Sequence, residues 1–252
     1  MTDTPRETRV LEAVVKLVDS LLDDFDVVDL LTELTEQCAQ LLDVTAAGIL
    51  LADPLDQLRL VAATSEQARE LELFQLQADE GPCVDCYATG QPVSIADLQT
   101  ESARWPHFVP AAVDAGFVAV HAVPMRAAGI VLGALGLFGT HRGELNEADR
   151  LVGQTLAHVA CVAILQEHPA NPSTVFGRLR AALSSRVVVE QAKGFLRETL
   201  DVSMDEAFTL LRSYARAHNE HLTDIARRLV TQRAERPALL SGIAALRVHP
   251  PG

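Results

Sequence analysis

A proline-containing break near residue 170 most constrains the fold, because it separates two parts of opposite charge. Residues 168–173 read His-Pro-Ala-Asn-Pro-Ser and contain no periodic apolar positions. Prolines spaced in this way end a helix and open a linker. Residues 1–174 carry a net charge of −17, whereas residues 175–236 carry +3. An acidic body with a basic module attached indicates an anionic partner for the basic part.

This break sets the expected domain organisation. We expect a first domain over residues 1–167, with an N-terminal helix at about 7–22. A linker at 168–173 follows, then a helical domain over 174–236 and a tail over 237–252.

Composition narrows the class of protein. Hydrophobic residues make up 48% of the 252, which is enough for a packed core and is atypical of a disordered chain. Four cysteines are too few for a disulfide scaffold. The N-terminus is polar, and no uncharged apolar run approaches the ~20 residues that span a bilayer. We therefore expect a cytoplasmic protein with no membrane partner.

The first part mixes helices and strands. Apolar residues at helical spacing predict helices, and short apolar runs bounded by turn residues predict strands. The order suits an antiparallel sheet with helices gathered on one side, an α+β fold. The expected helices are Val10–Leu22, Val27–Leu42 and Asn146–Gln166, and the expected strands are Ala46–Ala52, Leu58–Ala63, Phe117–Met125 and Ile130–Gly139.

Several short motifs in this part resemble those of a GAF domain, a small-molecule sensing module. They are Gly48-Ile49-Leu50-Leu51, Gly81-Pro82-Cys83, Gly90-Gln91-Pro92-Val93, Asp97-Leu98, Val123-Pro124 and Gly133-Ala134-Leu135. The resemblance covers residues of about 25–166. It implies a six-stranded antiparallel sheet, a ligand pocket between sheet and loops, and dimerisation through the first and last helices.

The second part predicts three helices packed as a bundle. Val188, Val189, Ala192 and Leu196 give one apolar helix face. Ser203 and Glu206 have the spacing of a capping box that opens the next helix. A third helix follows from the apolar spacing between Leu222 and Val230. Helices this short bury little alone, so we expect a three-helix, all-α bundle.

This part resembles an ANTAR domain over about 55 residues. The matching segments are Arg186-Val-Val-Val-Glu-Gln-Ala-Lys-Gly-Phe-Leu196, Asp205-Glu-Ala-Phe208, Leu210-Leu-Arg-Ser-Tyr-Ala215, His218-Asn219, Leu222 and Ala226-Arg-Arg-Leu-Val230. The resemblance implies an antiterminator that holds leader RNA stem-loops in a form that prevents a transcription terminator from folding.

RNA binding requires cations near phosphates and planar groups that stack on unpaired bases. The first helix carries its charges at steps of 4, 3 and 4, on one face. Pairs such as Glu190 with Lys193 also fit a solvated face without a ligand. The candidate RNA-binding residues are Arg186, Lys193, Arg197, Arg212, Tyr214, Arg216, His218, Arg227 and Arg228.

Cys83 and Cys86 form the one CxxC motif of the acidic part. No second pair follows to complete a zinc site, so the alternatives are two buried thiols or a redox pair. In the GAF-like interpretation they border the ligand pocket, together with Asp97 and His121. We expect no catalytic residues, no metal and no cofactor.

Three functions compete. The preferred one is a transcription regulator, not an enzyme, in which a GAF-like domain senses an unidentified small molecule and controls an RNA-binding antiterminator. The second is a GAF-fold thiol oxidoreductase of the free methionine sulfoxide reductase type. The third is a helix-turn-helix regulator that binds DNA.

The first and last helices of the acidic part carry more apolar surface than one packing face can bury. A helix that is apolar over so wide an arc meets two neighbours. The simplest second neighbour is the same helix pair of another subunit. We therefore expect a homodimer.

Overall fold

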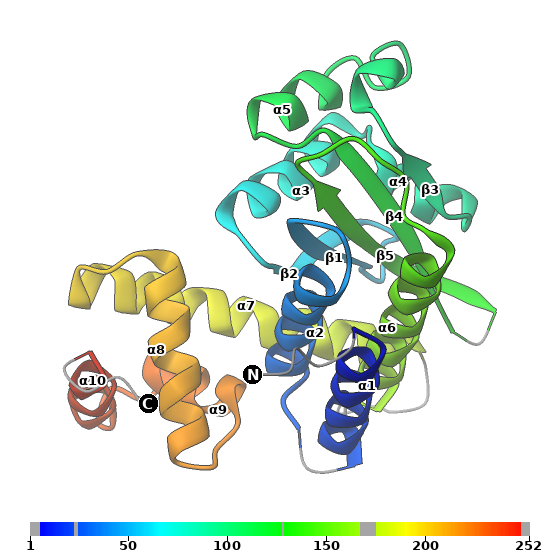
Figure 1. Ribbon diagram of the computed structural model, residues 1–252. Helices are drawn as coiled ribbons and strands as arrows, with labels where there is room; N and C mark the ends of the chain where they lie inside the picture. Colours follow the sequence, from blue (N-terminus) through cyan, green and yellow to red (C-terminus); the bar gives the residue numbers. More distant parts are fainter. Residues whose placement is uncertain (1–5, 23–24, 128, 167–174, 248–252) are drawn as a thin grey trace, which may run out of the picture. The chain divides into compact units, whose positions relative to one another are not determined.

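The computed structural model describes residues 6–22, 25–127, 129–166 and 175–247. The chain divides into two compact units (Figure 1). The first unit holds residues 1–24 and 30–181, and the second holds residues 25–29 and 182–252. The linker expected at 168–173 lies outside the described residues.

A five-stranded antiparallel sheet forms the centre of the first unit. Its strands are β1 (Ala46–Ala52), β2 (Leu58–Ala63), β3 (Val93–Ile95), β4 (Ala119–Ala127) and β5 (Ile130–Gly139). They lie in the order β2-β1-β5-β4-β3. The GAF resemblance implied six strands, and the described residues form five.

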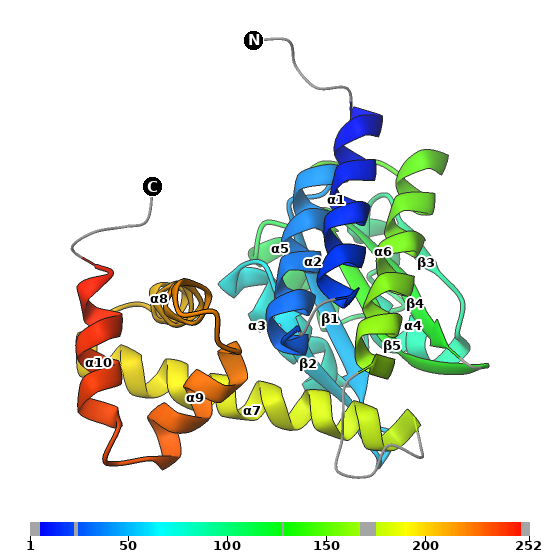
Figure 2. The ribbon, with the colours of Figure 1, turned by 90° about the horizontal axis from the view of Figure 1, so that it is seen from below.

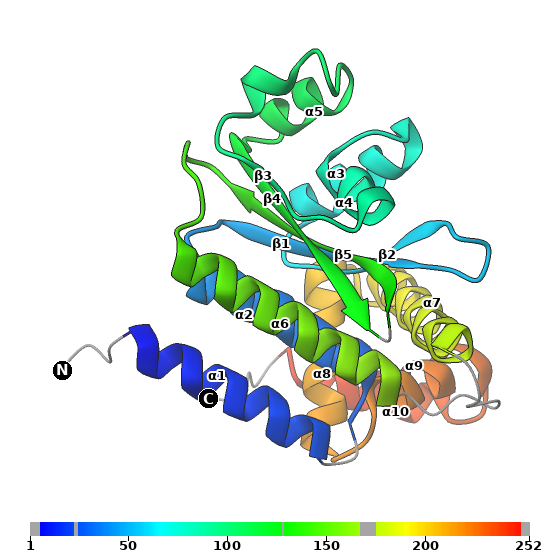
Figure 3. The ribbon, with the colours of Figure 1, turned by 90° about the vertical axis from the view of Figure 1, so that its right-hand side faces the viewer.

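Helices cover both faces of this sheet, whereas the sequence predicted helices on one side only. On one face lie α1 (Arg6–Leu22), α2 (Val27–Leu41) and α6 (Glu147–Gln166); on the other lie α3 (Glu66–Ala78), α4 (Pro82–Thr89) and α5 (Phe108–Asp114) (Figure 3). The side chains confirm the division. Gly153 of α6 lies against Leu137 and Val123, and the α3 and α4 side chains lie against Gly136, the strand neighbour of Leu137.

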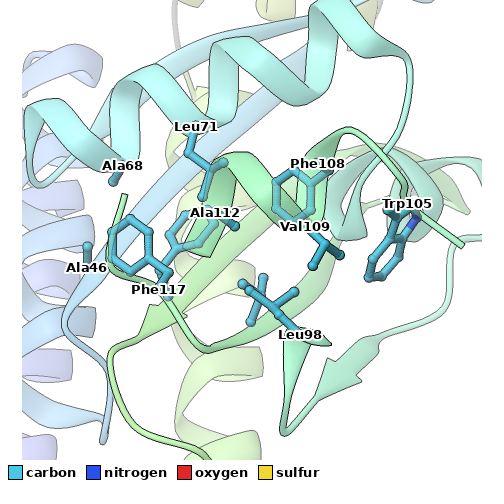
Figure 4. Close-up of a cluster of buried hydrophobic side chains, with 11 residues drawn as sticks. Ala46, Ala68, Leu71, Leu98, Trp105, Phe108, Val109, Ala112 and Phe117 are labelled. Atoms are coloured by element: carbon cyan, nitrogen blue, oxygen red, sulfur yellow. The ribbon is translucent and has the colours of Figure 1, made fainter. Parts of the chain in front are cut away.

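The sheet face under α3, α4 and α5 is packed with apolar side chains. Trp105 and Phe108 meet edge to face with ring centres 6.0 Å apart, and both are fully buried (Figure 4). The cluster consists of Ala46, Ala68, Leu71, Leu98, Trp105, Phe108, Val109, Ala112, Phe117, Val120 and Phe138. These side chains pack between the sheet and helices α3 and α5.

Helix α6 is the part of the described chain with the length and apolar composition of a membrane-spanning segment. The sequence predicted no such segment. Its inner residues, among them Leu156, Ala160 and Ile164, are buried, and the helix packs on β4. Such burial is typical of the core helix of a sheet domain.

The second unit consists of four helices (Figure 2): α7 (Val175–Leu200), which enters it at Ala182, α8 (Met204–Ala217), α9 (Leu222–Thr231) and α10 (Arg236–Ala245). The Ser203 hydroxyl caps α8 by accepting from the Glu206 N–H at 3.1 Å, which confirms that part of the capping box. The sequence predicted a tail over 237–252, where the structure has α10. This fourth helix packs on α8 and α9 and buries Leu239 and Ile243.

Candidate nucleic-acid interface and ligand sites

Two of the predicted RNA-binding cations are buried in the second unit. Arg186 and Lys193 of α7 are 9% and 6% exposed. Both pair with Glu190, whose Oε1 lies 2.9 Å from the Lys193 ammonium. The ammonium also lies 5.4 Å from the centre of the Phe208 ring of α8. The sequence predicted an exposed charged face, whereas the structure buries both side chains and brings Lys193 against Phe208 of α8.

The other cations lie nearer the surface. Arg197, Arg216 and Arg227 are exposed, and Arg212 and Arg228 are half-buried. Arg227 pairs with Asp224 of its own helix at 2.9 Å. Among the described residues no ion pair is found for Arg197.

Carboxylates partner several of these arginines. Arg212 and Arg216 both contact Asp29, which belongs to the same unit, with Arg216 Nη2 at 3.1 Å from its Oδ2. Arg228 bonds to Glu235 at 2.7 Å and to Glu220. The hydrogen bond from Glu235, with the charges of both carboxylates, raises the pKa of Arg228 further above its usual range.

Tyr214 and His218 of the second unit stack on one another. Their ring centres are 4.0 Å apart and their planes 24° apart. A hydrogen bond of 2.8 Å joins His218 Nδ1 to the Tyr214 carbonyl. Helix α10 supports the tyrosine from another side, because a Cβ at Gly242 would lie 2.6 Å from Tyr214 Cε2. The structure therefore brings the two predicted stacking residues together and adds α10, which was not predicted from the sequence.

Two arginines at the ends of α10 donate hydrogen bonds to backbone carbonyls of α9 and α7. Arg236 donates to the Leu229 carbonyl at the end of α9 and lies over the ring of Phe195. Arg247 donates to the Leu200 carbonyl at the end of α7 at 2.9 Å. Cations bonded to terminal carbonyls stabilise helix ends.

Cys83 and Cys86 lie on α4, between this helix and the sheet. Both are fully buried, and Cys83 Sγ donates to Glu72 Oε1 at 3.7 Å. Burial raises the pKa of Cys83 well above its usual value and that of Cys86 to about 12. Both are therefore thiols at neutral pH, whereas the thiolate is the nucleophilic form.

Glu72 of α3 is a fully buried carboxyl beside these thiols. Gln75 Nε2 donates to Glu72, and Gln75 Oε1 accepts from the Cys83 N–H at 3.0 Å. Burial raises the pKa of Glu72 to about 8. Gly136 gives this cluster room, since a Cβ there would lie 2.4 Å from Glu72 Oε1 and 2.9 Å from Cys83 Sγ.

His121 lies on the opposite face of the sheet from the cysteines, because successive β-strand residues point to opposite faces. Its neighbour Ala122 packs with Cys83 and Cys86. His121 instead lines a cavity of about 220 Å³. Asp97 pairs at 2.9 Å with Arg142, which lines the same cavity. The four predicted pocket residues therefore fall into two groups, with the thiols on one face and His121 and Asp97 near the cavity.

No group of three or more His, Cys, Asp or Glu side chains suited to a metal ion occurs among the residues that the structure describes.

Comparison with known families covers both units. The GAF domain family matches residues 26–165, which is more than half of the chain, and the ANTAR domain matches residues 177–230. Among curated proteins no match is found.

Several solved structures resemble the chain. One is the GAF domain of an Acinetobacter phosphoenolpyruvate-protein phosphotransferase, with 16% identity over 69% of this chain and 94% of that one, at a TM-score of 0.48. Another is a free methionine-R-sulfoxide reductase from Neisseria meningitidis, with 17% identity over 73% and 96% and a TM-score of 0.49.

The domain content is that of a regulator that carries an RNA-binding antiterminator domain. The chain belongs to the GAF domain family and carries an ANTAR domain behind its GAF domain.

Proposed function

We propose that the protein is a cytoplasmic transcription regulator in which the GAF domain senses a small molecule and the ANTAR domain binds leader RNA stem-loops as an antiterminator. The observation that carries the proposal is the match of residues 177–230 to an ANTAR domain. Ligand binding in the first unit would control the affinity of the second for RNA. Coupling of this kind typically changes affinity by roughly 5–150-fold. In this proposal the protein is not an enzyme.

The RNA-contacting surface is assigned to the exposed groups of the second unit. Arg197, Arg216 and Arg227 supply accessible cations for phosphates. The stacked rings of Tyr214 and His218 present a planar surface for an unpaired base. Arg212 and Arg228 are half-buried and paired with carboxylates. The burial of Arg186 and Lys193 favours a structural role for them.

Binding of the full-length protein to a leader stem-loop and to a DNA duplex of equal length tests the proposal. We expect tighter binding to RNA, with log affinity falling by ~0.7 per phosphate contact for each unit of log salt in unpaired stretches. Equal or tighter binding to the duplex would favour the DNA-binding alternative and contradict the proposal.

Single alanine variants locate the surface. Arg197→Ala, Arg216→Ala and Arg227→Ala should each weaken RNA binding by about 1 kcal/mol and flatten the salt dependence. Arg59→Ala removes the same charge from an exposed position on β2 in the first unit and serves as the control. An unchanged salt dependence in all three variants would place the RNA surface elsewhere.

We also propose a homodimer formed through the outer face of α1. Leu11, Val15, Val18 and Leu22 are spaced by 4, 3 and 4 residues and are 66%, 57%, 40% and 79% exposed. This spacing gives an apolar stripe with the heptad period of helices that pair with one another. Leu151 of α6, 69% exposed, adds to the apolar surface of the same unit.

Sedimentation of the full-length protein tests the dimer. We expect a dimer at micromolar concentration and a monomer for the Val15→Glu, Val18→Glu double variant. Glu12→Lys, a change of charge on the same helix, is the control and should leave the dimer intact. A monomeric wild type, or a double variant that still forms a dimer, would contradict the proposed homodimer.

A further inference from the structure

A carboxylate from the N-terminal part of the sequence is bonded to two arginines of the second unit. Residues 25–29 precede the C-terminal helices by more than half the chain, yet they belong to the same unit as those helices. Asp29 pairs with both Arg212 and Arg216 of α8, and Arg216 Nη2 lies 3.1 Å from its Oδ2. Charge-assisted bonds from two guanidinium groups are an arrangement that also suits a phosphate.

A second carboxylate lies at the start of α9. Asp26 Oδ2 accepts a hydrogen bond of 2.7 Å from the Thr223 N–H, in the first turn of that helix. Backbone N–H groups at a helix N-terminus bind anions. The hydroxyl of Thr223, a residue that is 7% exposed, has no hydrogen-bond partner among the residues that the structure describes. The start of α9 therefore offers an anion a backbone N–H and an unsatisfied buried hydroxyl.

The two carboxylates are held side by side by one turn of the chain. Asp26 Oδ1 accepts from the N–H groups of Val28 and Asp29, at 2.9 and 3.1 Å, and so caps α2. The groups that receive the carboxylates, two arginines and the start of α9, are therefore adjacent as well. Neighbouring anions are what a nucleic-acid backbone presents, and phosphate oxygens accept from the same donors as carboxylate oxygens.

The two arginines differ in how far Asp29 covers them. The side chain of Arg212 is 13% exposed while it contacts Asp29, whereas that of Arg216 is 51% exposed. A phosphate can thus reach Arg216 from its open side. Departure of Asp29 would uncover the guanidinium of Arg212 beside it and turn one accessible cation into two.

We propose that Arg212, Arg216 and the start of α9 form a phosphate site for RNA, and that Asp26 and Asp29 occupy this site and compete with RNA for it. The inference rests on the proposed RNA-binding function and adds its regulation. Helix α2 continues beyond Asp29 into residues that belong to the first unit. A ligand that alters the start of α2 would therefore change how often the two carboxylates occupy the site.

Removal of the two charges tests the competition with RNA. Asparagine at position 26 keeps the cap of α2, because asparagine and aspartate are equally good N-caps, but its amide nitrogen cannot accept from Thr223. The full-length Asp26→Asn, Asp29→Asn double variant should bind the leader stem-loop at least fivefold more tightly than the wild type, within the usual range of coupling between sites. Asp29→Asn alone, which leaves the cap untouched, should give a smaller gain of the same sign.

A matched double variant separates this site from the general effect of a less acidic protein. Asp201→Asn, Asp205→Asn removes two exposed carboxylates of the same unit that form no ion pair among the described residues. It should leave RNA affinity within twofold of the wild type. Equal affinities of the wild type and the Asp26, Asp29 variant, or equal gains in both double variants, would overturn the inference while leaving RNA binding itself intact.

An anion other than RNA tests the site independently of the proposed function. Calorimetric titration of the same full-length proteins with inorganic tripolyphosphate should show at least fivefold tighter binding to the Asp26, Asp29 variant than to the wild type. Arg212→Ala added to that variant should return the affinity to within twofold of the wild type. Stem-loop binding by none of the proteins would contradict the RNA-binding function, and the tripolyphosphate titrations would still decide the site. Equal tripolyphosphate binding by the wild type and the Asp26, Asp29 variant would overturn it.

Discussion

The two units bury ionisable side chains in opposite ways. In the first, Glu72 lies among an amide and a thiol, and no cation pairs with it among the described residues. In the second, Arg186 and Lys193 are buried together with a carboxylate, Glu190. A buried acid without a cation remains protonated, whereas buried cations keep their charge when an anion accompanies them. The first arrangement therefore makes the stability of its unit depend on pH, and the second makes stability depend on the Glu190 carboxylate.

The largest expected effect is the pH dependence of stability that Glu72 produces. Its pKa is about 8 in the folded chain and 4.5 when unperturbed, so the unfolded chain loses this proton first as pH rises. The stability that the neutral carboxyl contributes is complete below pH 4.5 and is lost as pH rises through 8. The shift sets a ceiling of roughly 5 kcal/mol, and we expect about 3 kcal/mol because buried sites relax.

Glu72→Gln should remove this dependence, since glutamine does not titrate and keeps the shape of the side chain. Urea unfolding at pH 5 and pH 8, followed by the fluorescence of Trp105, the protein's single tryptophan, reports on the first unit. Glu70→Gln, on the exposed side of the same helix, is the control and should keep the wild-type slope. A wild type equally stable at both pH values would contradict the neutral, buried carboxyl.

The second largest effect is the loss of stability expected when the Glu190 carboxylate is removed. Glu190→Gln leaves two buried cations without their shared carboxylate, and we expect a loss of about 2 kcal/mol, less than for a fully buried pair because Glu190 is half-buried. Thermal unfolding by circular dichroism measures it. Glu198→Gln, at an exposed position of α7, should change stability by less than about 0.5 kcal/mol. Equal effects of the two variants would mean that the buried cations do not depend on Glu190.

Much of the sheet was predictable, because the apolar runs of its long strands are uninterrupted. The bounds predicted for β1, β2 and β5 are those observed, and β4 is displaced by two residues. The helices α3, α4, α5 and α10 were not predicted, and of these α4 and α10 are short and lack a clear apolar period. Each has a proline, Pro82 or Pro237, in its first turn, where proline favours a helix start. That signal could have located both.

The sites were less predictable, because they depend on tertiary packing. The spacing of Arg186, Lys193 and Arg197 predicts a common side of one helix. It could not show that Phe208 covers Lys193 while Arg197 stays exposed. Likewise, alternation along β4 puts His121 and Ala122 on opposite faces, but the sequence does not reveal which face α4 covers.

The third effect concerns the support of the Tyr214–His218 stack by α10. A methyl group in Gly242→Ala would overlap the Tyr214 ring, which must shift, and overpacking of this kind costs about 1 kcal/mol. If the stack contacts RNA, affinity should fall about fivefold, equivalent to roughly 1 kcal/mol. Thermal unfolding and RNA titration measure the two effects.

Gly194→Ala on α7 is the control for stability, because no atom lies within 4 Å of the added carbon. It should stabilise the helix by about 0.5–1 kcal/mol, the usual gain of alanine over glycine. RNA affinity unchanged in Gly242→Ala, despite a measured loss of stability, would remove the stack from the RNA surface.

The smallest effect on stability and RNA binding is expected for substitution of the two thiols of α4. The same variants distinguish a regulator from a reductase. Cys83 and Cys86 are buried and protonated, so neither presents the thiolate that nucleophilic attack requires. In the Cys83→Ser, Cys86→Ser double variant, the change at Cys83 should cost at most about 1 kcal/mol of stability, because a hydroxyl can still donate to Glu72. It should also bind RNA within twofold of the wild type. Cys38→Ser, the same change at a buried thiol of α2, is the control for burying a hydroxyl.

Neither the wild type nor the double variant should reduce free methionine sulfoxide with a dithiol donor above the rate without protein. Reduction by the wild type that the double variant loses, while the Cys38 variant keeps it, would show a reductase and overturn the assignment of these thiols to the packed face of the sheet.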